Sequence, residues 1–176
     1  MTISTPHTTK GLWTVSRADV GSPRRRRCCA STTSTSPTGT TASTSAARAP
    51  GGDRDRTGRL PSDDLAGPTG VFLLGRYDGE PQSCAGLRVL DDRSVELTRV
   101  FVRHAVRGTG GGARLLAAVD EAARELGAER IVLDTRLDLV EARALYTRHG
   151  YREIPAYSSS PYAQIWYGRD LTAPAA

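Results

Sequence analysis

The chain has 176 residues, which is enough for one domain with a buried core and too few for two domains of ordinary size. It holds no run of 18 or more consecutive apolar residues of the kind that crosses a membrane. No apolar segment follows the basic residues of its N-terminus, as a secretory signal would require. We therefore expect a soluble, cytoplasmic protein. The three cysteines, Cys28, Cys29 and Cys84, lack the spacing of zinc ligands, so no metal is expected.

The charge of the chain is unevenly distributed. Residues 1–59 contain ten Lys and Arg against three Asp and Glu, whereas residues 60–176 contain fourteen against sixteen. The overall net charge of +5 thus arises in the N-terminal third. A uniformly basic protein would favour a nucleic-acid partner. Because the remainder is mildly acidic, we do not expect nucleic acid to be its partner.

The N-terminal third contains one expected strand and a long polar segment. Leu12 to Val15 predict a short first strand within residues 1–20. Residues 21–59 contain no Val, Ile, Leu, Met, Phe, Tyr or Trp. Such a segment cannot bury enough apolar area to offset its conformational entropy, so we predict that it is disordered.

The rest of the chain has the periodicity of a folded domain, over residues 60–172. Asp78-Gly79 and Asp91-Asp92 predict turns between strands. The order predicts an antiparallel meander followed by a β-α-β crossover, which makes an α+β (mixed α/β) domain around a mixed central sheet. Strands are expected at 71–74, 83–90, 95–102, 131–133, 151–154 and 165–167, and helices at 110–126 and 139–148.

A glycine-rich run, Arg107-Gly108-Thr109-Gly110-Gly111-Gly112, joins the strand expected at 95–102 to the helix expected at 110–126. Glycines let backbone N–H groups approach an anion closely, and the helix N-terminus adds a partial positive charge. Arg107 stands at the mouth of the run, where its guanidinium can pair with a phosphate oxygen. The run therefore predicts a cradle for a diphosphate.

The run also satisfies the dinucleotide-binding pattern G-x-G-x-x-G/A, with Asp134 as the candidate ribose-binding acid. Three observations argue against a dinucleotide. Five residues separate the strand from the loop, the preceding strand is the third of a meander, and about 40 residues after Asp134 are too few for the second half of a doubly wound sheet. Coenzyme A fits the pattern better.

These residues resemble the GNAT superfamily of N-acetyltransferases. Its motif Q/R-x-x-G-x-G/A is met by Arg107, Gly110 and Gly112, and residues 95–103 look like its fourth strand. A second motif, A-x-x-L-Y-x-x-x-G-F/Y, is met by residues 142–151. The resemblance covers residues 70–170 and implies a GNAT-like three-layer fold with acetyl-CoA as cosubstrate.

The resemblance also implies roles for single residues. Tyr146 stands where relatives have the tyrosine that protonates the coenzyme A sulfur, and a phenol with a pKa near 10 suits that role without much shift. Glu96 stands where many relatives have a carboxylate that acts as base. A core aromatic and a solvated strand charge are the alternatives for these two residues. The cofactor-binding positions are Phe101, Val102 and Arg103 for pantetheine, and Arg107, Gly108, Thr109, Gly110, Gly111 and Gly112 for the diphosphate, with Ala113 starting the helix.

The sequence departs from the family pattern at three places. Leu139 replaces a frequent asparagine and His104 a frequent proline. The family has two helices between its first two strands that wall the acceptor pocket, and residues 22–59 can form no amphipathic helix there. The segment is a natural basic arm, an insertion, or the product of a reading-frame error. In any of these cases catalysis by the chain is open to impairment.

The interpretation that follows is an N-acetyltransferase that acetylates a primary amine of a small molecule or peptide. The alternatives are a non-catalytic coenzyme A-binding module and a nucleic-acid binder acting through Arg24 to Arg27. A loop at residues 156–162 either lines the amine site or is an exposed hairpin loop. Relatives often form dimers, which leaves a homodimer open.

Overall fold

The computed structural model of the chain describes residues 11–19, 65–161 and 163–172. The segment predicted to be disordered, the Arg24–Arg27 arm and the proposed start of the domain at residue 60 lie outside these ranges. So does Tyr162 of the loop at 156–162.

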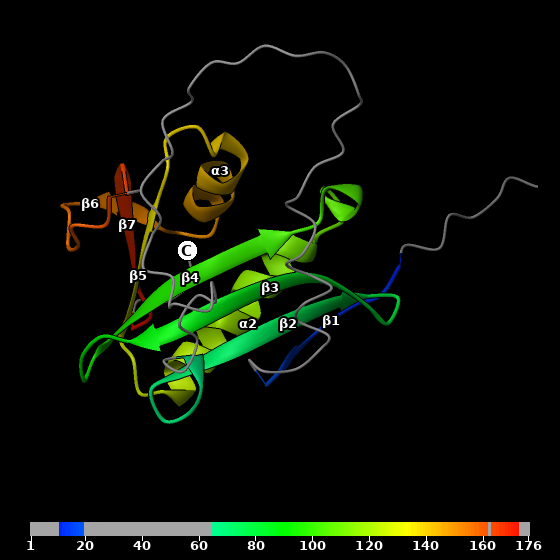
Figure 1. The fold of residues 1–176 in the computed structure, drawn as a ribbon, viewed down its shortest axis with the longest axis horizontal. Helices are drawn as coiled ribbons and strands as arrows, with labels where there is room; N and C mark the ends of the chain where they lie inside the picture. The colour runs from blue at the N-terminus through cyan, green and yellow to red at the C-terminus, as the bar shows by residue number, and fades with distance from the viewer. Residues whose placement is uncertain (1–10, 20–64, 162, 173–176) are drawn as a thin grey trace, which may run out of the picture.

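Seven strands form one mixed sheet in the order β1-β2-β3-β4-β5-β7-β6 (Figure 1). Every neighbouring pair is antiparallel except β4 and β5, which are parallel. The predicted meander and β-α-β crossover are therefore confirmed. The strands are β1 (Trp13–Arg17), β2 (Gly70–Tyr77), β3 (Glu80–Val89), β4 (Ser94–Val102), β5 (Arg130–Thr135), β6 (Arg152–Ile154) and β7 (Ile165–Asp170).

The turn between β2 and β3 is formed by Asp78 and Gly79. Both residues have positive φ, 51° and 83°, as a two-residue hairpin turn of the primed type requires. The expected turn is thus confirmed. A non-glycine residue is tolerated at the first position because aspartate enters the left-handed region more readily than most residues.

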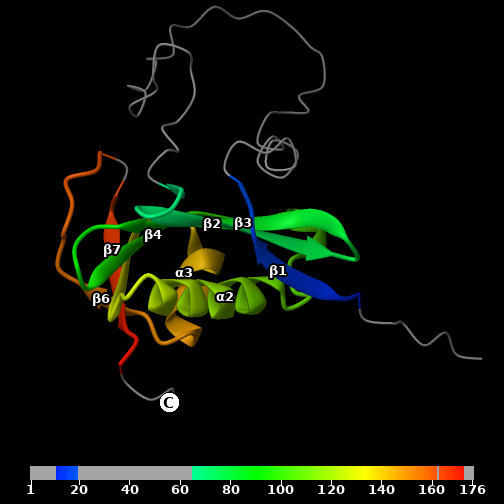
Figure 2. The same cartoon turned by 90° about the horizontal axis from the view of Figure 1, so that it is seen from below.

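Two α-helices, α2 (Gly111–Glu125) and α3 (Val140–Arg148), lie on the same side of the sheet (Figure 2). A short 3-10 helix, η3 (His104–Val106), connects β4 to the glycine loop. Helix α2 was expected at 110–126 and begins at Gly111, two residues before Ala113, and Gly127 follows its end with a φ of 80°. The sheet and these helices supply two layers; a helical layer on the other face would fall outside the described residues.

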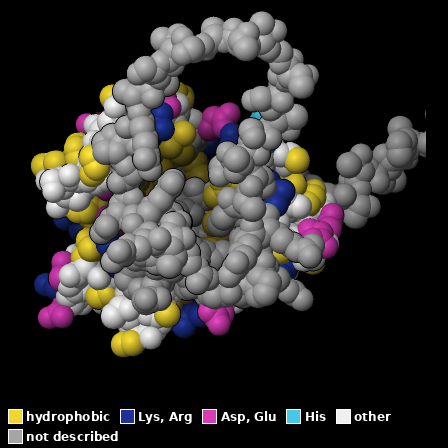
Figure 3. All heavy atoms as spheres, in the orientation of Figure 1, with side chains coloured by type: hydrophobic (Ala, Val, Ile, Leu, Met, Phe, Trp, Pro, Cys, Tyr) yellow, Lys and Arg dark blue, Asp and Glu magenta, His cyan; other side chains and the backbone are white. Residues whose placement is uncertain are grey.

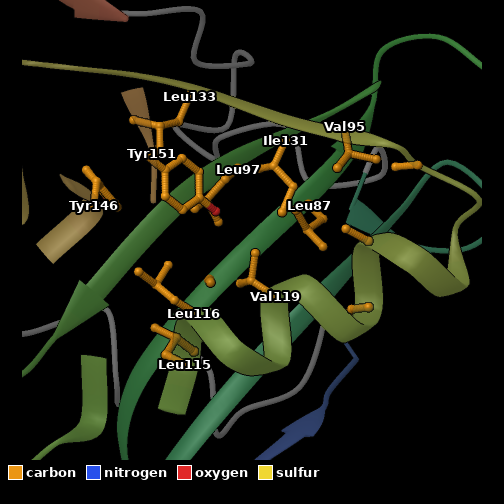
Figure 4. Packing of buried hydrophobic residues seen from close by; sticks show 14 of the residues in the cluster. Leu87, Val95, Leu97, Leu115, Leu116, Val119, Ile131, Leu133, Tyr146 and Tyr151 are labelled. Atoms are coloured by element: carbon orange, nitrogen blue, oxygen red, sulfur yellow. The ribbon is translucent and has the colours of Figure 1, made fainter. Parts of the chain in front are cut away.

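The main core fills the space between α2 and the sheet (Figure 4). Leu115, Leu116 and Val119 of α2 are fully buried there. They pack in one cluster with alternate residues of the central strands: Leu87, Val95, Leu97, Ile131 and Leu133. Because strand residues alternate between faces, the intervening residues Glu96, Val132 and Asp134 are directed to the opposite face.

Among the residues that the structure describes, no helix is long and apolar enough to span a membrane. On the face seen in Figure 3, acidic and basic side chains alternate around the described part of the molecule. Several charged side chains of the domain form ion pairs, such as Arg93 with Glu129 and Arg17 with Glu125.

Candidate active site

A cleft opens where β4 and β5 separate. The two strands pair only from Ser94 to Glu96 against Arg130 to Val132, although they continue to Val102 and Thr135. The resulting cleft has a volume of about 470 Å³. Its walls come from β3, β4, β5, α3 and the loop before β7, and include Glu96, Thr98, Asp134, Tyr146, Ser158 and Ser160.

A bulge in β4 accompanies this separation. Gly86 pairs with Thr98 and Cys84 pairs with Phe101, so two residues of β4 stand opposite one residue of β3. Arg99, the first of the two, has a φ of 54°. A bulge of this kind bends its strand and increases its local twist, which moves the end of β4 away from β5.

The three residues expected to face pantetheine follow this bulge. Phe101 is half-buried and packs against Phe72, Leu74 and Cys84 on the face away from α2. The backbone N–H of Arg103 donates to Gln82 O at 2.9 Å. The backbone carbonyl of Val102 accepts a hydrogen bond from Arg107 Nε at 3.2 Å. The backbone at these positions is therefore partly engaged by the protein itself.

The glycine loop presents several backbone N–H groups that have no acceptor among the described residues. The first N–H groups of a helix have no intrahelical partner, and here these belong to Gly111, Gly112 and Ala113. Gly108 and Gly110 have φ values of 79° and 93°, and a Cβ added at either would meet no atom within 4 Å. Glycine and a helix N-terminus together form an anion-binding concavity.

Two other N–H groups of the expected cradle are already used. The N–H of Arg107 donates to His104 O at 3.1 Å, and that of Thr109 donates to Val106 O at 3.4 Å. The Arg107 guanidinium donates to the Glu141 carboxylate of α3 at 2.7 Å. Both side chains are substantially exposed, 47% and 79%, so this pair is open to solvent and to exchange of partners.

Packing holds the loop in position from two sides. Trp13 of β1 lies against Gly111, where an added Cβ would come within 2.2 Å of the indole. Leu145 of α3 lies against Gly112, where an added Cβ would come within 2.9 Å of its methyl group. The close approach of the Trp13 indole therefore requires glycine at position 111, whereas at position 112 a shift of the Leu145 side chain would be needed to admit a Cβ.

Tyr146 of α3 lines the cleft while its ring is packed in the core. Its side chain is 5% exposed, and its ring centroid lies 5.8 Å from that of Tyr151 and 6.2 Å from that of Tyr167. Burial raises the pKa of Tyr146 to about 12, a larger shift than its sequence position predicted. Its hydroxyl forms no hydrogen bond with the described residues.

Glu96 lies on the opposite wall and has both carboxylate oxygens engaged. Its Oε2 pairs with Arg88 of β3, the residue directly opposite in the sheet. Its Oε1 accepts a hydrogen bond of 2.9 Å from the hydroxyl of Tyr157. Burial and the charge of Glu96 raise the pKa of Tyr157 well above its usual range. Tyr157 belongs to the loop at 156–162, so part of that loop lines the site.

Asp134 is the member of the site that sequence patterns did not assign to catalysis. Its Oδ2 accepts a hydrogen bond of 3.3 Å from Ser158, whose hydroxyl accepts one of 3.1 Å from the indole of Trp166. Burial raises the pKa of Asp134, and the charge of Glu96 raises it further. The sequence signal that could have found Asp134 is the alternation of side chains along a strand. Val132 pairs with Glu96, and Asp134, two residues later, lies on the same face of the sheet as Val132 and Glu96.

Leu139, where relatives often have asparagine, is at the cleft but 47% exposed at the start of α3. Within the described part of the chain, no group of His, Cys, Asp or Glu is placed to hold a metal ion.

Residues 42–151 match the family described as Acetyltransferase (GNAT) family. An uncharacterized N-acetyltransferase of Mycobacterium tuberculosis is 32% identical over 88 residues, which are 50% of this chain and 56% of the relative. A protein named IAA acetyltransferase from Azospirillum brasilense is 30% identical over 90 residues, 51% of this chain and 59% of that protein. The chain thus spans little more than half the length of these relatives.

Solved structures have the same fold. A GNAT-family acetyltransferase of Staphylococcus aureus is 26% identical with a TM-score of 0.53, covering 58% of this chain and 68% of the other. A GNAT-family acetyltransferase of Elizabethkingia anophelis, solved with acetyl-CoA bound, is 16% identical with a TM-score of 0.58, covering 90% and 97%. At that identity the second likeness concerns the fold alone. With its separated fourth and fifth strands, glycine loop and family match over more than half its length, the chain belongs to the GNAT family of acetyltransferases.

Proposed function

We propose that this chain is an N-acetyltransferase that transfers the acetyl group of acetyl-CoA to a primary amine. The observation that carries the proposal is the arrangement of one cleft. It holds the buried phenol of Tyr146 on one wall and the carboxylates of Glu96 and Asp134 on the other. The free N–H groups of the glycine loop lie at the N-terminus of the neighbouring helix α2.

Acetyl-CoA supplies an activated acyl group on a good leaving thiol. The N–H groups of Gly108, Gly110, Gly111, Gly112 and Ala113 are suited to bind its diphosphate. The end of β4 and the residue that follows it, at 101–103, are the expected site for pantetheine. These assignments follow from the free donors of the loop and from the separation of β4 from β5.

Two proton transfers accompany acetyl transfer. The acceptor ammonium has to lose a proton before its nitrogen attacks the acyl carbon, and the departing sulfur has to gain one. Tyr146 is the proposed donor to sulfur, because it lines the cleft and its phenol is protonated at neutral pH. The carboxylate side of the cleft, formed by Glu96 and Asp134, is the proposed side for amine binding and deprotonation.

Binding and turnover are measured separately to test this function. Acetyl-CoA binding is followed by calorimetry, and thiol release is followed with a panel of primary amines, with an alcohol of similar size as the non-amine control. Saturable thiol release with an acetylated amine identified by mass spectrometry is the expected result. Binding without turnover across the panel would favour the non-catalytic coenzyme A-binding module, and absence of binding would contradict both functions.

A pair of glycine variants provides the matched control for the cradle. Gly110 and Gly127 precede and follow α2, have φ values of 93° and 80°, and both have open space where a Cβ would lie. Alanine at either position incurs a similar backbone strain of about 1 kcal/mol. We expect Gly110→Ala to weaken acetyl-CoA binding severalfold and Gly127→Ala to leave it unchanged. The two variants should lose a similar free energy of unfolding.

A further inference from the structure

We propose that Asp134, and not Glu96, is the residue that takes the proton from the acceptor amine. This inference rests on the proposed function and assigns one of its steps. The observations that carry it are the different hydrogen-bonding states of the two carboxylates in the same cleft.

Both carboxylate oxygens of Glu96 are occupied by partners within the protein. One of its oxygens pairs with the Arg88 guanidinium and the other accepts the Tyr157 hydroxyl. The residue is 8% exposed. Both oxygens therefore have protein partners, and an amine can reach either oxygen only by displacing Arg88 or Tyr157.

Asp134, unlike Glu96, has a carboxylate oxygen that is not engaged by the described residues. Only Oδ2 accepts a hydrogen bond, the long one from Ser158, and Oδ1 has no partner among the described residues. Burial and the nearby negative charge both favour the protonated form of Asp134, while Ser158 and Arg88 favour the ionised form. A base that works near neutral pH needs a pKa above that of an ordinary aspartate. Burial and the charge of Glu96 raise the pKa of Asp134 in this direction.

The position of Asp134 also suits the reaction. Pairing of β5 with β4 ends at Val132, so Asp134 borders the widened part of the cleft. Tyr146, the proposed donor to sulfur, lines the same cleft. The proposed proton donor, Tyr146 of α3, and the proposed proton acceptor, Asp134 of β5, therefore face the same cleft from different elements.

Protons and electrons balance in this reaction. An N–H bond of the ammonium breaks, its electron pair stays on nitrogen, and the proton forms an O–H bond on the Asp134 carboxylate. The neutral nitrogen then forms the amide bond as the C–S bond breaks, and sulfur takes the phenolic proton of Tyr146. The second nitrogen proton restores the phenol, and Asp134 releases its proton to solvent.

Ser158 and Trp166 are positioning residues in this scheme. Trp166 Nε1 donates to Ser158 Oγ, which leaves the Ser158 proton directed to Asp134 Oδ2. This chain of hydrogen bonds fixes one oxygen of the carboxylate and leaves the other for the amine. The charged and titratable groups around Asp134 are Glu96 from β4, Arg88 from β3, Tyr157 from the loop before β7, Tyr146 from α3 and Arg136 after β5.

The test is the pH dependence of kcat/KM in four proteins, the wild type, Asp134→Asn, Glu96→Gln and Ser158→Ala, with one amine that the wild type acetylates. Ionisation of the amine itself is common to all four, so differences between them report the protein. Asp134→Asn is expected to lower kcat by about a hundredfold or more and to abolish the protein's contribution to the acidic limb. Its acetyl-CoA affinity is expected to stay within about twofold.

The other two variants are expected to shift the acidic limb in opposite directions. Glu96→Gln removes a charge that raises the Asp134 pKa, so the acidic limb moves to lower pH but is retained. Ser158→Ala removes a bond that lowers this pKa, so the limb moves to higher pH. Because both variants retain Asp134, their opposite shifts test the proposal even if Asp134→Asn fails to fold.

Two results would overturn the assignment alone. One is an active Asp134→Asn protein with an unchanged acidic limb; the other is loss of the limb in Glu96→Gln, which would make Glu96 the base. A wild-type protein that acetylates no amine would instead overturn the proposed function, and this inference with it.

Discussion

Trp13 in the first strand and Thr109 in the glycine loop are joined by a 2.9 Å hydrogen bond from the indole Nε1 to the threonine hydroxyl. The same hydroxyl donates to Val106 O at 2.7 Å. A residue of the first strand thus helps to hold the glycine loop, 96 positions later in the sequence. The close packing of the Trp13 indole on Gly111 completes this contact.

The Trp13–Gly111 contact predicts strong coupling between two substitutions. Gly111→Ala alone introduces an atom within 2.2 Å of the indole, and overpacking of this kind costs about 1–3 kcal/mol. In a Trp13→Leu protein the same substitution should cost much less, because the indole is gone. A double-mutant cycle on the free energy of unfolding measures the difference, and additive costs would contradict the contact.

Tyr146 and Tyr151 provide a matched pair for the proton-donor role. Both are buried tyrosines with neighbouring rings, but only Tyr146 lines the cleft. We expect Tyr146→Phe to lower kcat by about a hundredfold with little change in the KM for acetyl-CoA, since only the phenolic proton is lost. Tyr151→Phe removes a buried hydroxyl that has no hydrogen-bond partner among the described residues, and should leave kcat unchanged. Equal effects of the two substitutions would argue for a packing role.

We expect Glu141 and the diphosphate of coenzyme A to compete for the Arg107 guanidinium. This guanidinium pairs with Glu141 across the space between the loop and α3. Glu141→Gln should free this cation and tighten coenzyme A binding severalfold, with a stronger dependence on salt. Stability should change by only about 1 kcal/mol or less, because the ion pair is exposed. Pantetheine, which lacks the diphosphate, is the control ligand, and an equal gain in its affinity would contradict the mechanism.

Local sequence patterns were sufficient for the elements and for part of the site. Alternation and helical spacing predicted the strands of the meander and both helices, because these signals lie within about 5 to 15 neighbouring residues. The position of β7 between β5 and β6 was not predicted, since strand order depends on pairing between distant segments. Tyr146 and Glu96 were identified by motif position, and both line the cleft.

The surroundings of these residues could not be predicted. Tyr157 reaches Glu96 across 61 positions, and Ser158 reaches Asp134 across 24, through a loop without a periodic pattern. The sequence indicated that Glu96 is a carboxylate in a strand, but not that both of its oxygens have partners. That information decides which carboxylate remains available as a base, and it exists only once the loop is folded over β4 and β5.

The Asp120–Arg169 ion pair gives a prediction about stability and pH. Asp120 Oδ2 lies 2.8 Å from the Arg169 guanidinium, whereas Oδ1 is buried and has no hydrogen-bond partner in the part of the chain that the structure describes. Burial raises the pKa of Asp120 above its usual 3.8, more than the charge of Arg169 lowers it. A carboxyl whose pKa is higher in the folded than in the unfolded state binds its proton more tightly when folded. Its contribution to stability is therefore full below pH 3.8 and is lost as the pH rises through the folded value.

The substitution Asp120→Asn removes this titration and keeps the size of the side chain. We expect the free energy of unfolding of the wild type, relative to Asp120→Asn, to decrease as the pH rises from about 3.8 toward neutrality. Denaturant unfolding of both proteins at several pH values gives the difference directly, and other carboxylates cancel in it. If the difference instead increases with pH, the ion pair with Arg169 outweighs burial and the pKa of Asp120 is lowered in the folded state. Arg169→Gln separates the two effects: without the cation, the decrease should become steeper because only burial then acts on Asp120.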